Sequence, residues 1–237
     1  MDLKKFDKIL LSISGGKDSQ AMLTLITAQA AAQGVHDRLM AIHIDTGGEW
    51  PESQPHCKYL SGIFQIPLKI ITPTRTIAEE VIRRGAWPSA LCRFCTSYAK
   101  RDPYEKFIRS LSSQKILHIT GERKEESRHR SKLEEIANEE RVHTKLRCVT
   151  RWRPMLKYNQ SDIWAIIRES KLASHAAYDY GCDRVSCSLC VLAPQKDLII
   201  GAKHNREQAE NYLKIEKDIG SNFRHVKSLS EILGKIS

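Results

Sequence analysis

Residues 14 to 19 form a short polar segment whose backbone and side chains could hold a phosphate chain. The segment joins a glycine pair to a lysine, an aspartate and two serines, namely Ser14, Gly15, Gly16, Lys17, Asp18 and Ser19. Glycines let consecutive backbone N–H groups face one anion, and the start of a following helix adds a partial positive charge. The Walker spacing of kinase-like phosphate loops is absent. The segment predicts a phosphate loop, and the alternative is a plain Gly-Gly turn before a helix.

Two further polar stretches come at the ends of apolar runs. The first contains His43, Asp45, Thr46 and Gly47, and the second contains Gly121, Arg123, Ser127 and Arg130. The carboxyl ends of parallel strands form the ligand edge of an α/β sheet, so both stretches are expected beside the phosphate loop. Arginine suits phosphate because its planar fork donates paired hydrogen bonds. The alternatives are a strand-to-helix turn for the first stretch and a solvated helix face for the second.

The cysteines form a third group. Their number, seven, is odd, and four of them make two Cys-x-x-Cys pairs, Cys92 with Cys95 and Cys187 with Cys190. In a cytosolic chain such pairs favour a metal over disulfides. Two pairs brought together by the fold could supply four thiolates to zinc or to an iron-sulfur cluster. Ordinary buried thiols are the alternative.

The elements that must position these residues alternate between strand and helix. Strands are expected over 8–14, 38–45, 68–72, 115–121 and 151–155, and helices over 19–33, 54–62, 76–84, 159–167 and 205–219. A basic helix after Cys95 is expected to end in a turn marked by Pro103. The pattern predicts a doubly wound, mostly parallel α/β sheet with helices on both faces. We expect residues 1–170 to form this domain and residues 171–237 a small irregular extension with the second cysteine pair and a helical tail.

These motifs together resemble a known family. Residues 14–19 match the Ser-Gly-Gly-x-Asp-Ser motif of the PP-loop ATP pyrophosphatases at every defined position. The stretches at 45–47 and 121–130, and the cysteine segments at 95–103 and 186–190, are similar to the phosphoadenosine phosphosulfate reductase-like branch. They also resemble the ATP pyrophosphatases of DNA phosphorothioation systems. The similar segments run from about Leu10 to Leu192, which implies the adenine nucleotide alpha hydrolase-like fold.

The resemblance implies a site and its cofactors. ATP would be split into AMP and pyrophosphate, with Lys17, Asp18, Arg123 and Arg130 as the catalytic residues and Asp18 nearest to Mg²⁺. A four-iron, four-sulfur cluster would be held by Cys95, Cys187 and Cys190, with Cys92 or Cys182 as the fourth ligand. Zinc is the alternative metal.

Three functions are compatible with the sequence. The first is an ATP pyrophosphatase that adenylates a substrate for sulfur transfer, as in DNA phosphorothioation, with DNA and a sulfur donor such as a cysteine desulfurase as partners. The second is a phosphoadenosine phosphosulfate or adenylylsulfate reductase, although no cysteine follows Cys190 to serve as the family's C-terminal nucleophile. The third is a nucleic-acid-binding subunit that holds a nucleotide without turnover.

The net charge and the pattern of apolar residues bear on the partner and the location of the protein. The formal net charge of +10 suits a polyanionic partner, and it equally suits phosphate binding combined with a solvated basic surface. The sequence contains neither a signal peptide pattern nor an apolar run of membrane-spanning length. We therefore expect a cytoplasmic protein that does not bind membranes.

Overall fold

The computed structural model describes residues 1–234, and its centre is one six-stranded sheet in the order β3-β2-β1-β4-β6-β5. Its strands are β1 (Lys8–Ser12), β2 (Leu39–Ile44), β3 (Leu68–Ile71), β4 (Lys115–Ile119), β5 (Ile136–Asn138) and β6 (Cys148–Trp152). Strands β1, β2, β4 and β6 run parallel, while β5 pairs antiparallel with β6 at the edge. The centre of β1 is wholly buried, as an apolar run in a parallel sheet requires. The predicted mostly parallel α/β fold is confirmed.

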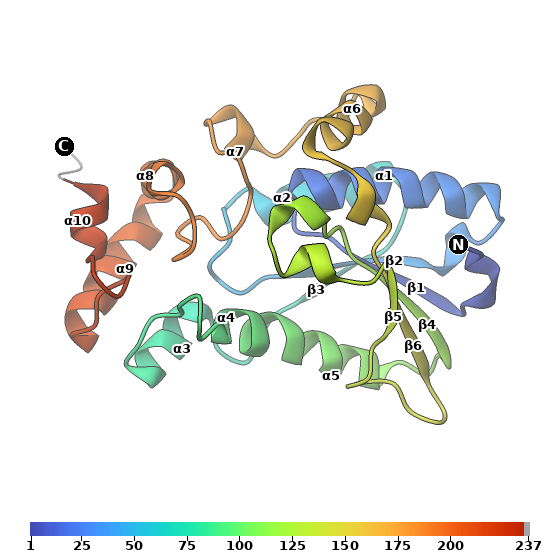
Figure 1. Ribbon diagram of the computed structural model, residues 1–237, viewed down its shortest axis with the longest axis horizontal. Coiled ribbons are helices and arrows are strands. Elements are labelled where there is room, and N and C mark those ends of the chain that lie inside the picture. The colour runs from blue at the N-terminus through green and yellow to red at the C-terminus, as the bar shows by residue number, and fades with distance from the viewer. Residues whose placement is uncertain (235–237) are drawn as a thin grey trace. The chain divides into compact units, whose positions relative to one another are not determined.

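Helices cover both faces of this sheet (Figure 1). They are α1 (Lys17–Ala32), α2 (Ser53–Ile63), α5 (Asp102–Ser110) and α6 (Gln160–Ser170). Apolar side chains of α1, α2 and α6 share one core with the strands, represented by Met22, Leu60 and Ile167. Helix α5 lies on the opposite side of the sheet. This arrangement follows from right-handed crossovers, which place consecutive helices on one face until the direction of strand addition reverses.

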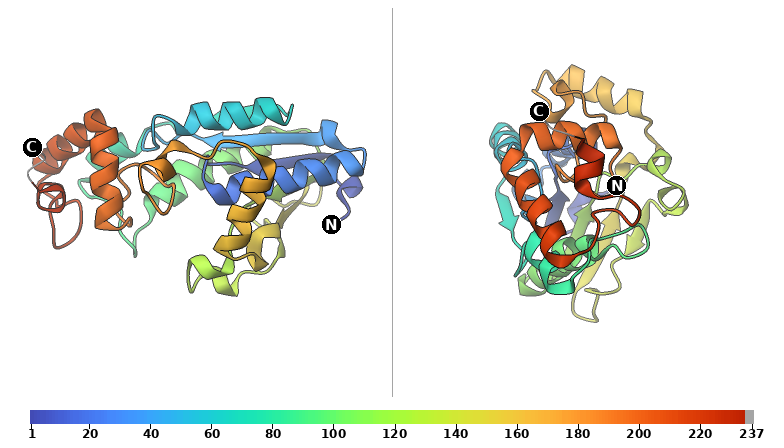
Figure 2. Two further views of the ribbon diagram at one scale, coloured as in Figure 1. Left: turned by 90° about the horizontal axis from the view of Figure 1, so that it is seen from above. Right: turned by 90° about the vertical axis from the view of Figure 1, so that its left-hand side faces the viewer.

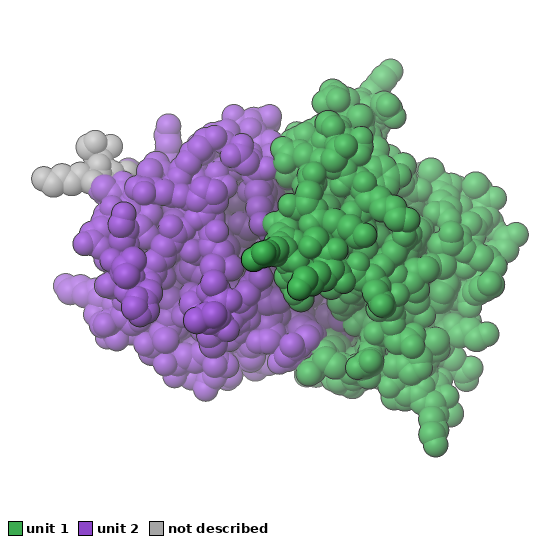
Figure 3. Space-filling model, in the orientation of Figure 1, with its two compact units in different colours: residues 1–43, 54–70, 105–175 green, residues 44–53, 71–104, 176–237 purple. Residues whose placement is uncertain are grey.

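The chain folds into two compact units (Figure 3). Unit 1 consists of residues 1–43, 54–70 and 105–175, and unit 2 consists of residues 44–53, 71–104 and 176–237, of which 235–237 lie outside the described residues. The expected division between residues 170 and 171 falls close to the last change of unit. Two earlier segments of the expected first domain, 44–53 and 71–104, belong to unit 2.

Unit 2 is built mainly from short helices, namely α3 (Ile77–Arg84), α4 (Phe94–Thr96), α7 (Ala176–Asp179), α8 (Gln195–His204), α9 (Arg206–Ile219) and α10 (Leu229–Leu233). Helices α8 and α10 both pack against α9, as the orange and red ribbons of Figure 2 show. Their core is aromatic: the ring of Trp87 lies 5.0 Å from both Tyr212 and Phe223. Residues 71–104 therefore share a core with residues more than a hundred positions later in the chain.

The structure corrects several expected elements. The last parallel strand ends at Trp152 instead of Met155, and the edge strand β5 was not expected. Pro103 does not end a helix: it is the second residue of α5, and helical backbone runs through it. A π-helical turn over Ser97–Arg101 precedes it. Short 3-10 turns complete the chain at Leu3–Lys5, His36–Arg38, Lys124–Glu126, Arg130–Lys132 and Pro154–Lys157.

Within residues 1–234, no helix has both the length and the apolar character needed to span a bilayer.

Candidate functional site

The predicted phosphate loop connects β1 to α1 in unit 1. Gly15 has a φ of 80°, a left-handed conformation that glycine adopts without strain, and Gly16 is the N-cap of α1. The hydroxyl of Ser19 donates to the carbonyl of Gly16 at 2.8 Å and accepts from the backbone N–H of Ser14 at 3.2 Å. These bonds fold the loop back over the first turn of the helix.

The loop leaves backbone donors unused. Within residues 1–234, the N–H groups of Gly15, Asp18 and Ser19 have no hydrogen-bond acceptor, although Gly15 and Ser19 are buried. Buried N–H groups without an acceptor are uncommon in proteins, and at a helix N-terminus they are the donors that an anion satisfies. The loop therefore fits a phosphate group.

Asp18 lies between two cations. One of its carboxylate oxygens accepts a hydrogen bond from Nε of Arg123, and the other lies 3.9 Å from Nζ of Lys17. Both cationic residues are only 3% exposed. Arg123 also pairs with Glu125, so its guanidinium is engaged on two sides. The structure thus brings together three of the four predicted catalytic residues, with Arg123 holding Asp18 in place.

Gly121 lies against the same turn of α1. A Cβ atom added to Gly121 would lie 3.0 Å from the backbone oxygen of Asp18 and 3.2 Å from the backbone nitrogen of Ser19. The absence of a side chain lets the chain after β4 approach the phosphate loop this closely. Gly121 was predicted as a binding residue, and the structure gives it a steric role beside the loop.

A second charged group follows β4. Glu122 accepts hydrogen bonds from Thr120 at 2.6 Å and from Nε of Arg153 at 2.9 Å. Burial raises the pKa of Glu122, but Thr120 and the surrounding arginines outweigh it and hold the pKa below its usual value. Arg153 is 6% exposed and was not singled out from the sequence, because its position beside Glu122 depends on the pairing of β4 with β6.

The last two residues of this charged stretch have local contacts. Arg130 pairs with Glu126, four residues earlier in the chain. The exposed hydroxyl of Ser127 accepts a hydrogen bond from the backbone N–H of Arg130 at 3.2 Å. Ser127 therefore orders the turn that presents Arg130.

His43 lies on β2 beside the loop and is 1% exposed. Its Nδ1 is 3.2 Å from the carbonyl oxygen of Ile13 and 3.5 Å from the sulfur of Cys57. Its Nε2 is buried and has no hydrogen-bond partner among residues 1–234. An unpaired buried ring nitrogen is costly, and since Nδ1 donates to the carbonyl of Ile13, Nε2 of the neutral ring can accept one hydrogen bond from a ligand.

Asp45, Thr46 and Gly47 belong to unit 2. The backbone N–H and hydroxyl of Thr46 both donate to Glu49, at 2.8 and 2.7 Å. Gly47 has a φ of 73°, and its N–H donates to the carboxylate of Asp45 at 3.0 Å. The segment is thus a tight turn stabilised by its own carboxylates.

Three of the four predicted cysteine ligands lie around common neighbours in unit 2. Cys187 lies 3.9 Å from a carboxylate oxygen of Glu49, and Nζ of Lys100 lies 3.5 Å from the same oxygen. Burial raises the pKa of Cys187 to about 12, with Lys100 acting against the rise and Glu49, Cys190 and Cys95 adding to it. Lys100 and Glu49 were not predicted as part of this site.

The Cys187 loop is fixed by close packing. The backbone N–H of Ser188 donates to the carbonyl of Gly48 at 3.0 Å. Gly201 of α8 lies so close to the Ser188 carbonyl that a Cβ there would approach its oxygen to 2.0 Å. Helix α8 thereby holds the second cysteine pair near Glu49.

The two other cysteines considered as ligands have different surroundings. Cys92 is exposed, and its N–H donates to the hydroxyl of Ser89 at 3.0 Å. Cys182 is 5% exposed and packs with Trp50 and Ala177. Burial, together with Asp197, raises the pKa of Cys182 to about 11, which keeps the thiol protonated at neutral pH.

Among residues 1–234, no three His, Cys, Asp or Glu side chains converge on one ion position. Cys95, Cys187 and Cys190 offer thiolate sulfur, a donor that both zinc and iron-sulfur clusters accept.

Comparison with known proteins gives a family match over most of the chain. The family model of the phosphoadenosine phosphosulfate reductase domain matches residues 8–193. The match covers the phosphate loop, the Gly121 stretch and both cysteine pairs. It begins with β1 and ends after the Cys187 loop.

Several individual proteins are also similar to this chain. A crystal structure of phosphoadenylyl-sulfate reductase from Candida auris in a phosphate complex has a TM-score of 0.56 at 17% identity, covering 78% of this chain and 83% of that one. It shows a shared fold. An uncharacterized protein of Methanocaldococcus jannaschii is 26% identical over 77% of this chain, and the match spans only 36% of that relative. A tRNA-cytidine(32) 2-sulfurtransferase of Aeromonas hydrophila is 32% identical over 38% of this chain and 30% of its own length.

Proposed function

The chain belongs to the phosphoadenosine phosphosulfate reductase domain family, and from this premise we propose that it cleaves ATP to AMP and pyrophosphate to activate a substrate for sulfur transfer. The observation that carries the proposal is the set of unpaired N–H groups in the loop from Ser14 to Ser19, at the N-terminus of α1. Those donors suit the β- and γ-phosphates of ATP. The similarity to a tRNA sulfurtransferase supports sulfur transfer as the purpose of the activation.

In the proposed reaction, an oxygen of the acceptor attacks the α-phosphorus of ATP. A bond from that oxygen to the α-phosphorus forms while the bond to the β-phosphate oxygen breaks, and pyrophosphate leaves with the electron pair. Lys17 and the loop N–H groups would stabilise the negative charge that develops on pyrophosphate. The adenylated oxygen then leaves as part of AMP when a sulfur nucleophile attacks the acceptor.

The remaining predicted residues receive supporting roles in this proposal. Asp18 would bind Mg²⁺ on the phosphates, and Arg123 is a positioning residue because its guanidinium holds Asp18. His43 would contact the nucleotide through its unpaired Nε2. We also propose that Asp45, Thr46, Gly47, Ser127 and Arg130 line the nucleotide site.

We propose an iron-sulfur cluster on Cys95, Cys187 and Cys190, which when bound would supply redox or sulfur-binding chemistry. Lys100 is the cation that would offset the charge of the three thiolates. Iron and sulfide analysis of anaerobically purified protein tests this assignment. We propose a nucleic acid as the acceptor, with DNA phosphorothioation as the specific case, and a cysteine desulfurase as the sulfur donor.

The reductase is the second candidate, and the family match favours it. Reduction of a sulfonucleotide needs a nucleophilic cysteine. Cys182 is one cysteine that could replace the missing C-terminal nucleophile, but its burial and raised pKa make it a poor nucleophile. We therefore rank ATP cleavage above the reductase.

The test is the release of pyrophosphate and AMP from ATP, measured with and without DNA or RNA. Lys17→Ala and Asp18→Ala are each expected to lower the rate about 10² to 10³-fold, because charge placed at a developing charge contributes about 2 to 4 kcal/mol. Lys217→Ala, an exposed lysine on α9, is the matched control and should keep the wild-type rate. Full activity in both loop variants would refute the proposal, as would ADP as the product.

A further inference from the structure

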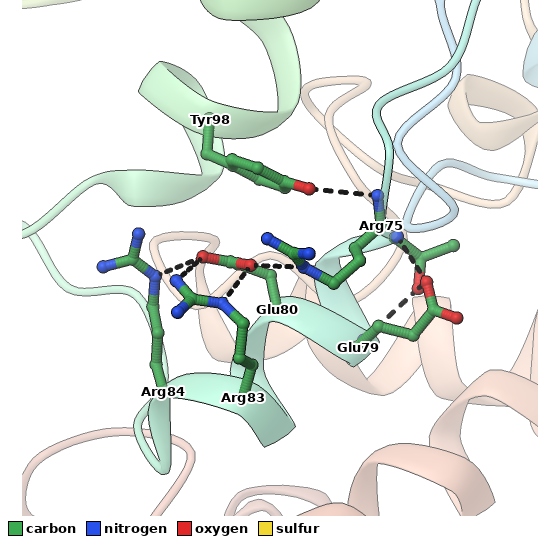
Figure 4. Close-up of polar contacts among 7 residues, drawn as sticks. Arg75, Glu79, Glu80, Arg83, Arg84 and Tyr98 are labelled. Carbon is green, nitrogen blue, oxygen red and sulfur yellow. Dashed lines mark hydrogen bonds and ion pairs between the residues drawn. The ribbon is translucent and has the colours of Figure 1, made fainter.

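Three arginines surround one buried glutamate in unit 2: Arg83 and Arg84 lie on α3, and Arg75 lies just before it (Figure 4). The side chain of Glu80 is 1% exposed, and it accepts hydrogen bonds from Arg75 at 3.1 Å, from Arg84 at 2.6 Å, and from Arg83 at 2.8 and 2.5 Å. The three arginine side chains are 41%, 50% and 37% exposed, for Arg75, Arg83 and Arg84 respectively. We call these three residues the α3 arginine cluster.

The cluster holds more positive charge than Glu80 requires. Arg83 alone already pairs with the carboxylate through two nitrogens. The three arginines carry three positive charges against the two negative charges of Glu80 and of Glu79, which interacts with Arg75, a surplus of one. Like charges held together repel, and the C-terminus of α3 offsets only part of this cost for Arg83 and Arg84. The surplus is stabilised once an anion binds.

The guanidinium groups also keep free donors in fixed positions. Within residues 1–234, the terminal nitrogens of Arg75 and Arg84 and Nη1 of Arg83 have no acceptor. Arg84 stacks over the ring of Phe94 at 4.6 Å, and Arg75 lies over the ring of Tyr98 at 5.4 Å. Rings that hold the planes of arginines reduce the side-chain entropy that binding would otherwise cost.

We propose that the α3 arginine cluster binds the phosphodiester backbone of a nucleic acid. Arginine forks fit phosphate oxygens, and backbone contacts of this kind fix register without reading sequence. Half-exposed side chains on a helix surface suit an extended polyanion, whereas small anions are usually enclosed in a concave site. The net charge of +10 adds long-range attraction for the same partner.

The proposal deepens the proposed function, since it rests on a nucleic acid being the acceptor, and it can be tested separately. Binding is measured without ATP, using a labelled DNA strand of about 30 nucleotides, long enough for several phosphate contacts, its duplex and an RNA of the same sequence. The variant Arg83→Gln/Arg84→Gln is expected to bind at least one of these probes about tenfold more weakly or worse, because charge-assisted hydrogen bonds to phosphate oxygens are lost. Its slope of log affinity against log salt should be shallower by about 1.4 to 1.8.

The matched control removes the same charge elsewhere. Lys214→Gln/Lys217→Gln removes two exposed lysines of α9, which packs against α3, and should weaken binding less than the arginine variant does, because the arginine forks stay in place. If the arginine variant unfolds, as judged by circular dichroism, Glu80→Gln/Arg83→Gln/Arg84→Gln removes the buried charge as well and should fold while still binding weakly.

Three results would overturn the proposal. The first is that the arginine variants bind the probes as tightly as the lysine control does. The second is that wild-type protein binds none of the probes at about 50 mM salt. The third is that wild-type protein binds polyglutamate as tightly as it binds the oligonucleotides, which would indicate an acidic protein partner. If wild-type protein binds oligonucleotides through the arginines but releases no pyrophosphate from ATP, the proposed function is refuted and the nucleic-acid proposal stands.

Discussion

At the scale of single residues, Gly121 is the point where the chain after β4 packs against the phosphate loop. The atoms that a Cβ would meet belong to the backbone of Asp18 and Ser19, which cannot rotate away as a flexible side chain can. Adding one methyl group must therefore shift either the strand end or the first turn of α1. That turn holds the residues proposed to bind ATP.

Gly121→Ala is expected to lower pyrophosphate release about tenfold and to destabilise the fold by about 1 to 3 kcal/mol, because small displacements of reacting groups and overpacking both have such effects. Pyrophosphate release and urea denaturation measure the two effects. Gly62→Ala is the control, since a Cβ at Gly62 in α2 would have no neighbouring atom of residues 1–234 within 4 Å. That change should preserve activity and stabilise the helix slightly. A fully active Gly121→Ala enzyme would show that the close approach is not needed.

The sequence predicted the conformation of the segment from Ser14 to Ser19 well because that conformation is local. A glycine pair between an apolar run and a helix specifies its own turn. The pairing of Arg123 with Asp18 joins residues 105 positions apart and depends on β1 lying beside β4. The sequence placed both residues at the ligand edge, but only the fold shows that Arg123 orients Asp18.

At the scale of elements, a polar network crosses the otherwise apolar strands of unit 1. Ser12 on β1 lies 2.8 Å from Nε2 of His118 on β4, and Nδ1 of that histidine lies 2.5 Å from Glu139 after β5. Arg151 on β6 donates to the same carboxylate at 2.6 Å. The network connects β1 to the antiparallel edge of the sheet.

The network should make the stability of the protein depend on acid pH. Burial raises the pKa of Glu139, but His118 and Arg151 outweigh it and lower the pKa from 4.5 to about 2. Burial lowers the pKa of His118, on which Glu139, Arg151 and Glu122 also act. Both groups bind protons more tightly when unfolded, so their stabilisation is complete above the ordinary pKa values and is lost as pH falls.

Glu139→Gln is expected to lower the free energy of unfolding at pH 7 by about 1 to 3 kcal/mol, because it weakens charged hydrogen bonds. The variant should also lose less stability than wild type between pH 4.5 and 2, the range set by the shifted carboxylate. Urea denaturation at several pH values measures both effects. Glu140→Gln removes an exposed carboxylate next in the chain and should behave as wild type. Parallel pH profiles for wild type and Glu139→Gln would contradict the assigned role.

Helices and strands were predicted correctly where the apolar periodicity of the sequence is strong. They were missed where contacts with distant parts of the chain determine the local structure. Strand β5 has only three residues and an exposed Ile136, so nothing local distinguishes it from a loop. Pro103 indicated a stop, but the helical backbone continues through it from the π-helical turn at Ser97–Arg101 into α5. Helix α8 became recognisable only through packing, where Gly201 meets the Cys187 loop.

At the scale of the whole molecule, each compact unit is assembled from three segments that are separate in the sequence. Residues 71–104 lie between strands of the sheet in sequence, yet their core partners come from residues 176–233. Sequence periodicity reports which face of a helix is apolar and says nothing of which distant helix will cover it. The expected division at residue 170 therefore could not anticipate this exchange.

A chain shortened to residues 1–175 is expected to lose the folded structure of residues 71–104. Val81, Trp87 and Phe94 pack against Leu198, Tyr212 and Phe223, all of which this truncation removes. Losing large core side chains costs about 3 to 5 kcal/mol each, so several such losses approach the whole stability of a domain. Limited trypsin digestion should cut the shortened chain at Arg83, Arg84 or Arg93 under conditions that leave the full chain intact. Hydrogen exchange should show the same loss of protection over α3. Equal protection of residues 71–104 in the two chains would instead support an independent domain ending near residue 170, as the sequence alone had suggested.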